Sequence, residues 1–173
     1  PPHYARGISD LLEGSIELAI GAYRTGGSGH GYVLARSSVM STMFFLEACA
    51  NACLDSLSLP EKLASDYEKL SVLSKFDTFA RMYKGKTIDR SRDEVQGLSD
   101  IVKVRNLYVH PKAQRVNWKK DTDIISTAVS PKTGHLGIPT IISYCSPNDA
   151  ITVLRAAHTF MRYLLIDLCE MRP

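Results

Sequence analysis

The sequence predicts an all-α protein: an up-and-down bundle of four to five helices, with a small irregular or hairpin insertion before the last helix. Two observations lead to this expectation. Apolar residues recur at helical spacing over long stretches, and helix start and stop signals separate those stretches. The chain has 173 residues, of which 45% are hydrophobic and 23% charged, which suits one globular domain spanning residues 1–173.

The first element expected is a helix over residues 4–23, whose isoleucines and leucines supply the apolar content. A glycine-rich segment, 25–31, follows it. This segment lacks the Lys-Ser/Thr ending of a phosphate-binding P-loop, and no predicted strand precedes it, so its composition favours a flexible linker. Residues 1–31 are therefore interpreted as an N-terminal helix and Gly-rich linker within the single domain.

Two further helices are expected in the first half of the chain. The helix over 32–57 carries apolar residues around nearly its whole circumference, which predicts burial on most sides. The helix over 58–83 is expected to begin at Ser58, which forms a capping-box pattern with Glu61. Gly85 is a typical stop for that helix.

The fourth helix is expected to begin at Ser91, which forms a second capping-box pattern with Glu94. Its end is predicted by Pro111, because proline disfavours helical geometry in the residue before it. His110 should therefore be the last residue of the helix or lie just past it.

The pattern changes between the fourth and fifth helices, and we assign residues 112–146 to an insertion. Prolines and glycines interrupt it, and its β-prone segments, 124–125 and 140–144, suggest a small hairpin. Ser146 then predicts the cap of a fifth helix that runs to about Met171.

The formal net charge of +3 is a mild excess. Acidic and basic residues are mixed along most of the chain, so an acidic partner is permitted but not required. No stretch approaches the length of a membrane span, and no basic-then-apolar signal segment opens the sequence. We therefore expect a cytoplasmic protein that does not enter a membrane.

The four cysteines are expected to be small buried hydrophobic residues in a reducing compartment. Cys49 and Cys53 are four residues apart, which on a helix could suit a metal, but no His or third Cys lies close by in sequence. No cluster of His, Cys or carboxylate residues has the spacing of metal ligands, so neither a metal nor a cofactor is expected.

An arginine, Arg105, lies in the middle of the apolar stripe of the fourth helix. A guanidinium there must be paired or must face a shared cavity, because burying an unpaired charge costs several kcal/mol. At about 100° per residue, the stripe consists of Leu98, Ile101, Val102, Tyr108 and Val109.

The second helix has the same anomaly. Glu47 lies at the centre of its apolar stripe, and Asn51 follows one turn later. We therefore expect Glu47 and Asn51 to face Arg105, because a carboxylate can accept two N–H bonds from a guanidinium and hold its plane fixed. The stripe consists of Met40, Met43, Phe44 and Leu54.

Two more polar residues border Arg105. Asn106 and His110 are four residues apart, so they are neighbours on one edge of the fourth helix. A histidine beside a fixed guanidinium suits a phosphate site. The arginine would hold a phosphodiester and neutralise charge in the transition state, and the imidazole would take or give a proton.

These residues carry a resemblance to a known family. The stretch 104–110, Val-Arg-Asn-Leu-Tyr-Val-His, resembles the Arg-x4-6-His motif of HEPN-domain proteins, in the common form with Asn directly after Arg. The stretch 44–51 is similar to an early helix of many such domains, so the resemblance covers about 34–110 and the last helix. It implies a HEPN-like bundle and a dimer that brings two copies of the motif together in a cleft. Many members cleave RNA without a metal, using the RNA 2′-hydroxyl as nucleophile and leaving a cyclic phosphate.

On that resemblance, Arg105, Asn106 and His110 are expected to be catalytic, whereas Glu47 and Asn51 are supporting residues inferred from the stripe. The leading hypothesis is a metal-independent endoribonuclease that acts as a homodimer. It would be of the toxin or defence kind, held in check by an antitoxin-like protein partner. The Gly-rich linker and the insertion are not part of the common pattern, which leaves the RNA target open.

A basic segment with one tryptophan follows the motif and suits single-stranded RNA, through phosphate contacts and base stacking. The alternative is a solvated loop with one anchoring tryptophan. The candidate RNA-binding residues are Lys112, Arg115, Trp118, Lys119 and Lys120. A second basic stripe, in the fifth helix, could extend this groove, but the wet face of an otherwise apolar helix is the favoured interpretation. That stripe consists of Arg155, His158 and Arg162.

Two alternatives compete with the enzyme. One is a non-catalytic HEPN-like helical module that binds a nucleotide, RNA or a protein in the same groove and tolerates a His110 turned away. The other is a structural dimer with a buried Arg–Glu pair, which predicts that Arg105 is sealed from solvent. The enzyme needs Arg105 and His110 close to a common point that solvent can reach.

Overall fold

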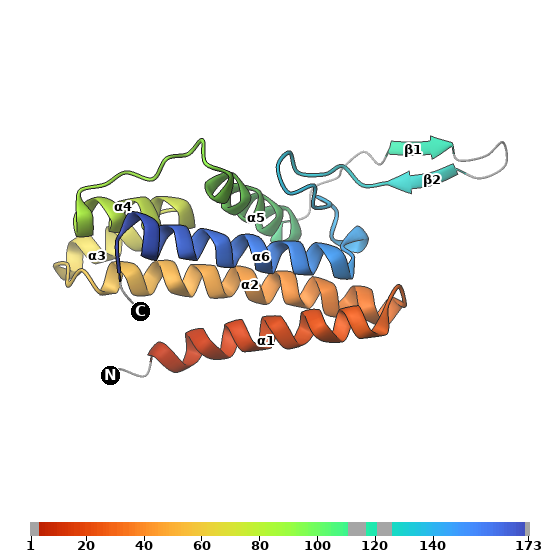
Figure 1. Ribbon diagram of the computed structural model, residues 1–173, viewed down its shortest axis with the longest axis horizontal. Helices are drawn as coiled ribbons and strands as arrows, with labels where there is room; N and C mark the ends of the chain where they lie inside the picture. The colour runs from red at the N-terminus through yellow and green to blue at the C-terminus, as the bar shows by residue number, and fades with distance from the viewer. Residues whose placement is uncertain (1–3, 111–116, 121–125, 172–173) are drawn as a thin grey trace.

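A computed structural model describes residues 4–110, 117–120 and 126–171, with side chains over 7–110 and 129–171. The all-α bundle is confirmed (Figure 1). Its helices are α1 (Tyr4–Thr25), α2 (Gly29–Asp55), α3 (Glu61–Glu68), α4 (Val72–Lys84), α5 (Asp93–Val109) and α6 (Pro147–Arg162), continued by the π-helix η2 (Tyr163–Leu168). A short hairpin of β1 (Asn117–Lys120) and β2 (Ser126–Val129), and the 3₁₀ turn η1 (Ile142–Tyr144), lie between α5 and α6.

Helix α2 is the central element of the bundle. It packs against α1, α4 and α6, and also touches α3 and α5 (Figure 1). Its residues Val39, Leu46 and Ala50 are buried, and the core around it also contains Phe76, Phe79 and Phe160 from α4 and α6. The predicted burial of this helix on most sides is confirmed, except for one face on which Val33 and Phe44 are exposed.

The same helix corrects the expectation about membrane-spanning length. By length and composition alone, α2 is long and apolar enough to cross a membrane. The expectation was wrong because it considered only unbroken apolar runs, and scattered polar residues interrupt the apolar residues of this segment. Half of its most apolar window is buried inside the bundle, and the core helix of a soluble protein passes the same test.

The predicted Gly-rich linker is a tight turn instead. Ser28 caps α2 by accepting a hydrogen bond from the N–H of Gly31, at 3.1 Å, so the helix begins inside the glycine run. A Cβ on Gly31 would overlap the carbonyl oxygen of Gly26 and lie 2.9 Å from Thr25 Oγ1. Glycine is therefore required here by the close approach of the two helix ends, and α1 and α2 form an antiparallel pair.

The predicted helix over 58–83 is two helices, α3 and α4. Ser58 does not cap, because it has φ of 49° in the left-handed region, and α3 begins only after Pro60. The break falls before Ser71, whose hydroxyl caps α4 by accepting a hydrogen bond from Ser74 N at 3.2 Å. Gly85 ends α4 with φ of 66°, as expected.

The start of α5 also differs from the prediction, whereas its end agrees. Ser91 does not cap the helix, because its backbone N–H and hydroxyl both donate to Asp89 Oδ1, and the N-cap position is held by Arg92. Val109 is the last helical residue and His110 follows as the C-cap, as Pro111 predicted.

The insertion contains a hairpin, but between other segments than expected. β1 pairs antiparallel with β2, with Trp118 opposite Ala128. Residues 124–125 lie outside the described residues, and the stretch 140–144 contains η1 instead of a strand. The 130–140 stretch turns back onto α5: Tyr108 Oη donates to the carbonyl of Pro139 at 2.9 Å, and the backbone of Leu136 donates to Asp100 at 2.8 Å.

The last helix begins as the sequence predicts. Ser146 Oγ accepts a hydrogen bond from Asp149 N, and Asp149 Oδ2 accepts one from Ser146 N at 2.7 Å, which completes a capping box. The α-helix changes to a π-helix at Tyr163 and ends at Leu168, slightly before the expected Met171.

Candidate functional site

Arg105 and Glu47 meet where α5 crosses α2. Arg105 Nη2 lies 3.5 Å from Glu47 Oε2, and Arg105 Nη1 donates to Asn106 Oδ1 at 3.2 Å. The side chains of Arg105 and Glu47 are 33% and 38% exposed. The expected contact is therefore present, but it is a single long contact and not a bidentate pair. A pair this exposed adds little stability, and a guanidinium with five N–H donors keeps capacity for a further acceptor.

A pocket of about 190 Å³ lies beside this contact. That volume is below the range of typical small-molecule sites, so the pocket suits a single group such as a phosphate or part of a longer ligand. It lies at the junction of α2, α4 and α5, and is lined by Met43, Leu46, Glu47, Leu70, Ser71, Val72, Ile101, Val102, Arg105 and Asn106. Arg105 is not sealed from solvent, contrary to what a purely structural ion pair predicts.

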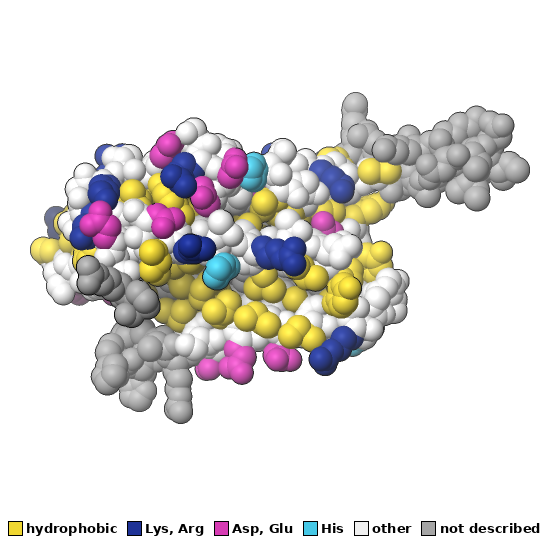
Figure 2. Space-filling view, in the orientation of Figure 1, with side chains coloured by type: hydrophobic (Ala, Val, Ile, Leu, Met, Phe, Trp, Pro, Cys, Tyr) yellow, Lys and Arg dark blue, Asp and Glu magenta, His cyan; other side chains and the backbone are white. Residues whose placement is uncertain are grey.

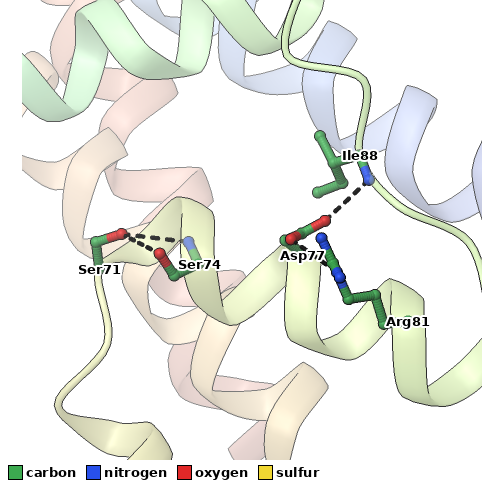
Figure 3. Close-up of polar contacts among 5 residues, drawn as sticks. All are labelled: Ser71, Ser74, Asp77, Arg81 and Ile88. Atoms are coloured by element: carbon green, nitrogen blue, oxygen red, sulfur yellow. Dashed lines mark hydrogen bonds and ion pairs between the residues drawn. The ribbon is translucent and has the colours of Figure 1, made fainter.

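The N-terminus of α4 forms one wall of the pocket and is held by polar contacts (Figure 3). Ser71 caps the helix and its hydroxyl lies 2.8 Å from that of Ser74. One turn further, Asp77 accepts hydrogen bonds from Ile88 N at 2.9 Å and from Arg81 Nε at 3.0 Å. Because Ile88 is buried, its bond to Asp77 fastens the α4–α5 connection to α4, whereas the bond from Arg81 lies within α4, where the arginine side chain is 58% exposed.

Asn51 does not face Arg105, and that part of the prediction was wrong. Asn51 Oδ1 accepts a hydrogen bond of 2.6 Å from Nζ of Lys75, which is 4% exposed. The reason is the arrangement of the neighbours: at Asn51, one turn beyond Glu47, α2 lies beside α4. A buried ammonium needs an acceptor, and the amide oxygen provides one.

Lys75 is a residue that the sequence reasoning missed. It precedes Phe76 and lies one turn before Phe79, so it falls on the apolar stripe of α4, the same signal that singled out Arg105. Lys75 and Asn51 line a larger groove of about 1010 Å³ between the start of α1, the end of α2 and α3. Glu47 borders both the groove and the small pocket.

His110 stands at the end of α5. Its backbone N–H donates to the carbonyl of Asn106 at 3.0 Å, and its side chain is exposed. Among the described residues that line the small pocket, Asn106 is included and His110 is not. The structure thus gathers Glu47, Arg105 and Asn106 around one pocket, with His110 one helical turn beyond Asn106.

The candidate RNA-binding residues are described only in part. Lys112 and Arg115 lie outside the described residues, and of Trp118, Lys119 and Lys120 the structure describes the backbone of β1. The second basic stripe, on α6, is exposed, as its interpretation as a wet face predicts (Figure 2).

All four cysteines are free, and three of them are buried. Burial raises the pKa of Cys49 to about 11, and that of Cys53 and Cys145 to about 12. These thiols therefore stay protonated at neutral pH and are poor nucleophiles and poor metal ligands. Within the described ranges, no three His, Cys, Asp or Glu side chains are grouped as metal ligands would be.

Comparison of the chain with protein-family models, curated proteins and solved structures finds no match.

Proposed function

We propose that this protein is a metal-independent endoribonuclease of the HEPN type, which acts in the cytoplasm as a homodimer. The observation that carries the proposal is the placement of Arg105. Its guanidinium lies at a small pocket between Glu47 and Asn106 and is one-third exposed, with His110 at the end of the same helix.

The role of Arg105 is to bind the phosphodiester. A guanidinium offers five N–H donors in one plane, and contacts to Glu47 and Asn106 occupy two of them. The others can bind the non-bridging oxygens and stabilise the charge that develops on them during transfer. Because Glu47 and Asn106 contact different nitrogens, they restrict rotation of the guanidinium and so act as positioning residues.

The role of His110 is proton transfer. The imidazole takes the proton of the RNA 2′-hydroxyl, the 2′-oxygen forms a bond to phosphorus, and the bond from phosphorus to the 5′-oxygen breaks. The 5′-oxygen leaves as a hydroxyl after receiving a proton from a protonated imidazole. The products are a 2′,3′-cyclic phosphate and a 5′-hydroxyl end. A homodimer supplies two copies of His110, one as base and one as acid.

The surface beside the motif supports a dimer. On α2, Val33 and Phe44 are exposed and line a shallow groove of about 430 Å³ together with Met40. On α5, Val109 is exposed directly before His110. Exposed apolar side chains on neighbouring helices favour association through this side, which would bring two motifs together.

The test is cleavage of a single-stranded RNA in the presence of a chelator. We expect wild type to produce cyclic-phosphate ends, and Arg105→Ala and His110→Ala to reduce the rate by about a hundredfold or more. Arg81→Ala is the matched control, because it also removes one arginine that contacts a carboxylate, at 3.0 Å, away from the pocket. Cleavage that survives both motif substitutions would refute the proposal.

A second candidate function is a non-catalytic HEPN-like helical module that binds a nucleotide, RNA or a protein partner. The groove beside Lys75 favours it, because about 1010 Å³ is ample for a small ligand or a peptide segment. Under this alternative, wild type binds RNA without cleaving it, and Arg105→Ala weakens binding.

A further inference from the structure

One side of α1 is apolar, exposed and without a partner among the described residues. Four large side chains spaced three or four residues apart form it: Leu12, Ile16, Ile20 and Tyr23. The helix already buries a different side, at Ser15, Ala19 and Ala22, against the bundle. A contiguous row of exposed apolar side chains on a helix that is packed on its other side marks an interaction surface.

Charged rows border this apolar row on both sides (Figure 2). The basic row is Arg155, His158 and Arg162 on α6, and the acidic row is Asp10, Glu13 and Glu17 on the outer edge of α1. All six side chains are exposed, and both rows have the spacing i, i+3, i+7, so each follows one side of its helix for about two turns. We call these three rows together the α1–α6 face.

We propose that the α1–α6 face binds the same face of a second copy of this chain. A two-fold axis that lies in the face along the apolar row, parallel to α1, places the acidic edge of α1 of each copy opposite the basic row on α6 of the other. The two apolar rows then meet at the centre, and an acidic row meets a basic row on each side of them.

The order of the charges along the helices agrees with this axis. Because α1 and α6 run in opposite directions (Figure 1), Asp10 lies toward the same end of the face as Arg162, and Glu17 toward the same end as Arg155. The axis therefore pairs Asp10 with the partner's Arg162 and Glu17 with the partner's Arg155. An axis perpendicular to α1 would instead place basic row against basic row.

The same charges disfavour other occupants. A nucleic acid would be attracted by the basic row but repelled by the acidic row, and an acidic protein surface would meet the same conflict. A second copy satisfies both rows at once, because a face with both signs on opposite sides of an apolar row is complementary to itself.

This association is independent of the proposed ribonuclease. The pocket beside Arg105 is lined by described residues of α2, α4 and α5 and of the turn before α4, and by none of α1 or α6. A dimer through the α1–α6 face therefore neither closes that pocket nor completes it.

The first experiment measures the mass of the full chain in solution by sedimentation or light scattering. We expect wild type to associate, and Ile16→Glu to halve the mass, because it places a charge in the apolar row. Ile16 is already 41% exposed, so the variant should fold, which thermal melting checks. Met82→Glu is the matched control: Met82 is 45% exposed on α4, outside the face, and its substitution should leave the mass unchanged.

The second experiment reverses the charges. Arg155→Glu with Arg162→Glu, and separately Asp10→Lys with Glu17→Lys, should each abolish association through the α1–α6 face, and so halve the mass, through like-charge repulsion. A mixture of the two variant chains should associate again, and so should one chain that carries all four changes. A monomeric wild type, an unchanged mass for Ile16→Glu, or a mixture that fails to associate would overturn the proposal.

Discussion

Replacing Gly31 with alanine tests the close approach of α1 and α2. The added Cβ would overlap the carbonyl oxygen of Gly26 and lie 2.9 Å from Thr25 Oγ1 and 3.2 Å from the carbonyl oxygen of Ala22. Two of these three atoms belong to the backbone, so the turn must open. Overpacking of this kind costs about 1–3 kcal/mol, whereas alanine gains up to about 1 kcal/mol over glycine in a helix. We expect a net loss of about 1–2 kcal/mol in the free energy of unfolding.

The assay is urea unfolding and thermal melting, with Gly14→Ala as the matched control. Gly14 lies inside α1, and a Cβ there meets no atom within 4 Å. The same substitution should therefore stabilise the protein by about 0.5–1 kcal/mol. For a chain of this length, each kcal/mol corresponds to about 2–4 °C in melting temperature. If Gly31→Ala were as stable as wild type, the account of the turn would be refuted.

Three further predictions concern stability. Ser146→Ala should lower the free energy of unfolding by about 1 kcal/mol, because it removes a helix cap. Ser91→Ala removes no cap and should change that free energy by less than about 0.5 kcal/mol. Equal effects of the two substitutions in urea unfolding would contradict the assigned caps. Phe160→Ala should lower the free energy of unfolding by about 3–5 kcal/mol. The reason is that Phe160 is fully buried, with its ring centroid 5.1 Å from that of Phe76. A decrease below about 1 kcal/mol in chemical unfolding would indicate that the ring lies outside the core. Burial raises the pKa of Cys53 from 9.0 to about 12. The thiol therefore ionises at a lower pH in the unfolded chain than in the folded protein. The stability that comes from keeping the buried thiol protonated is complete below pH 9 and is lost as pH rises toward 12, by about 1.4 kcal/mol per pH unit. In urea unfolding above pH 9, the stability of Cys53→Ala should fall less steeply with pH than that of wild type, and equal slopes would contradict the raised pKa.

Several features of the fold could be predicted because they depend on contacts within a few residues. The capping box of Ser146 and Asp149 closes inside one turn, the left-handed Gly85 ends α4, and Pro111 requires α5 to end at its neighbour. The periodicity of apolar residues likewise identified the helices and thus the all-α class. In each case the preference is local, so the tertiary structure had only to agree with it.

Other local patterns were ambiguous, and the structure shows which of their outcomes occurs. Ser91 has the same capping pattern as Ser146, but Asp89 takes its hydroxyl and backbone N–H, so the cap is lost. The glycine run predicted a linker, yet the helices meet so closely at Gly31 that the run becomes a turn. At Ser91 the deciding group, Asp89, is only two residues away in the sequence, whereas at Gly31 the close approach of α1 and α2 decides the outcome.

The candidate site divides in the same way. By itself, the sequence determined that Arg105 and Glu47 lie on apolar stripes, because that follows from helical periodicity, and a charge on such a stripe needs a partner. Only the tertiary structure decided which partner each polar group meets: Glu47 lies at Arg105, whereas Asn51, one turn away, lies at Lys75 of α4. The physical reason is that a stripe defines which side of a helix is covered, while the residue opposite depends on how neighbouring helices cross and pack.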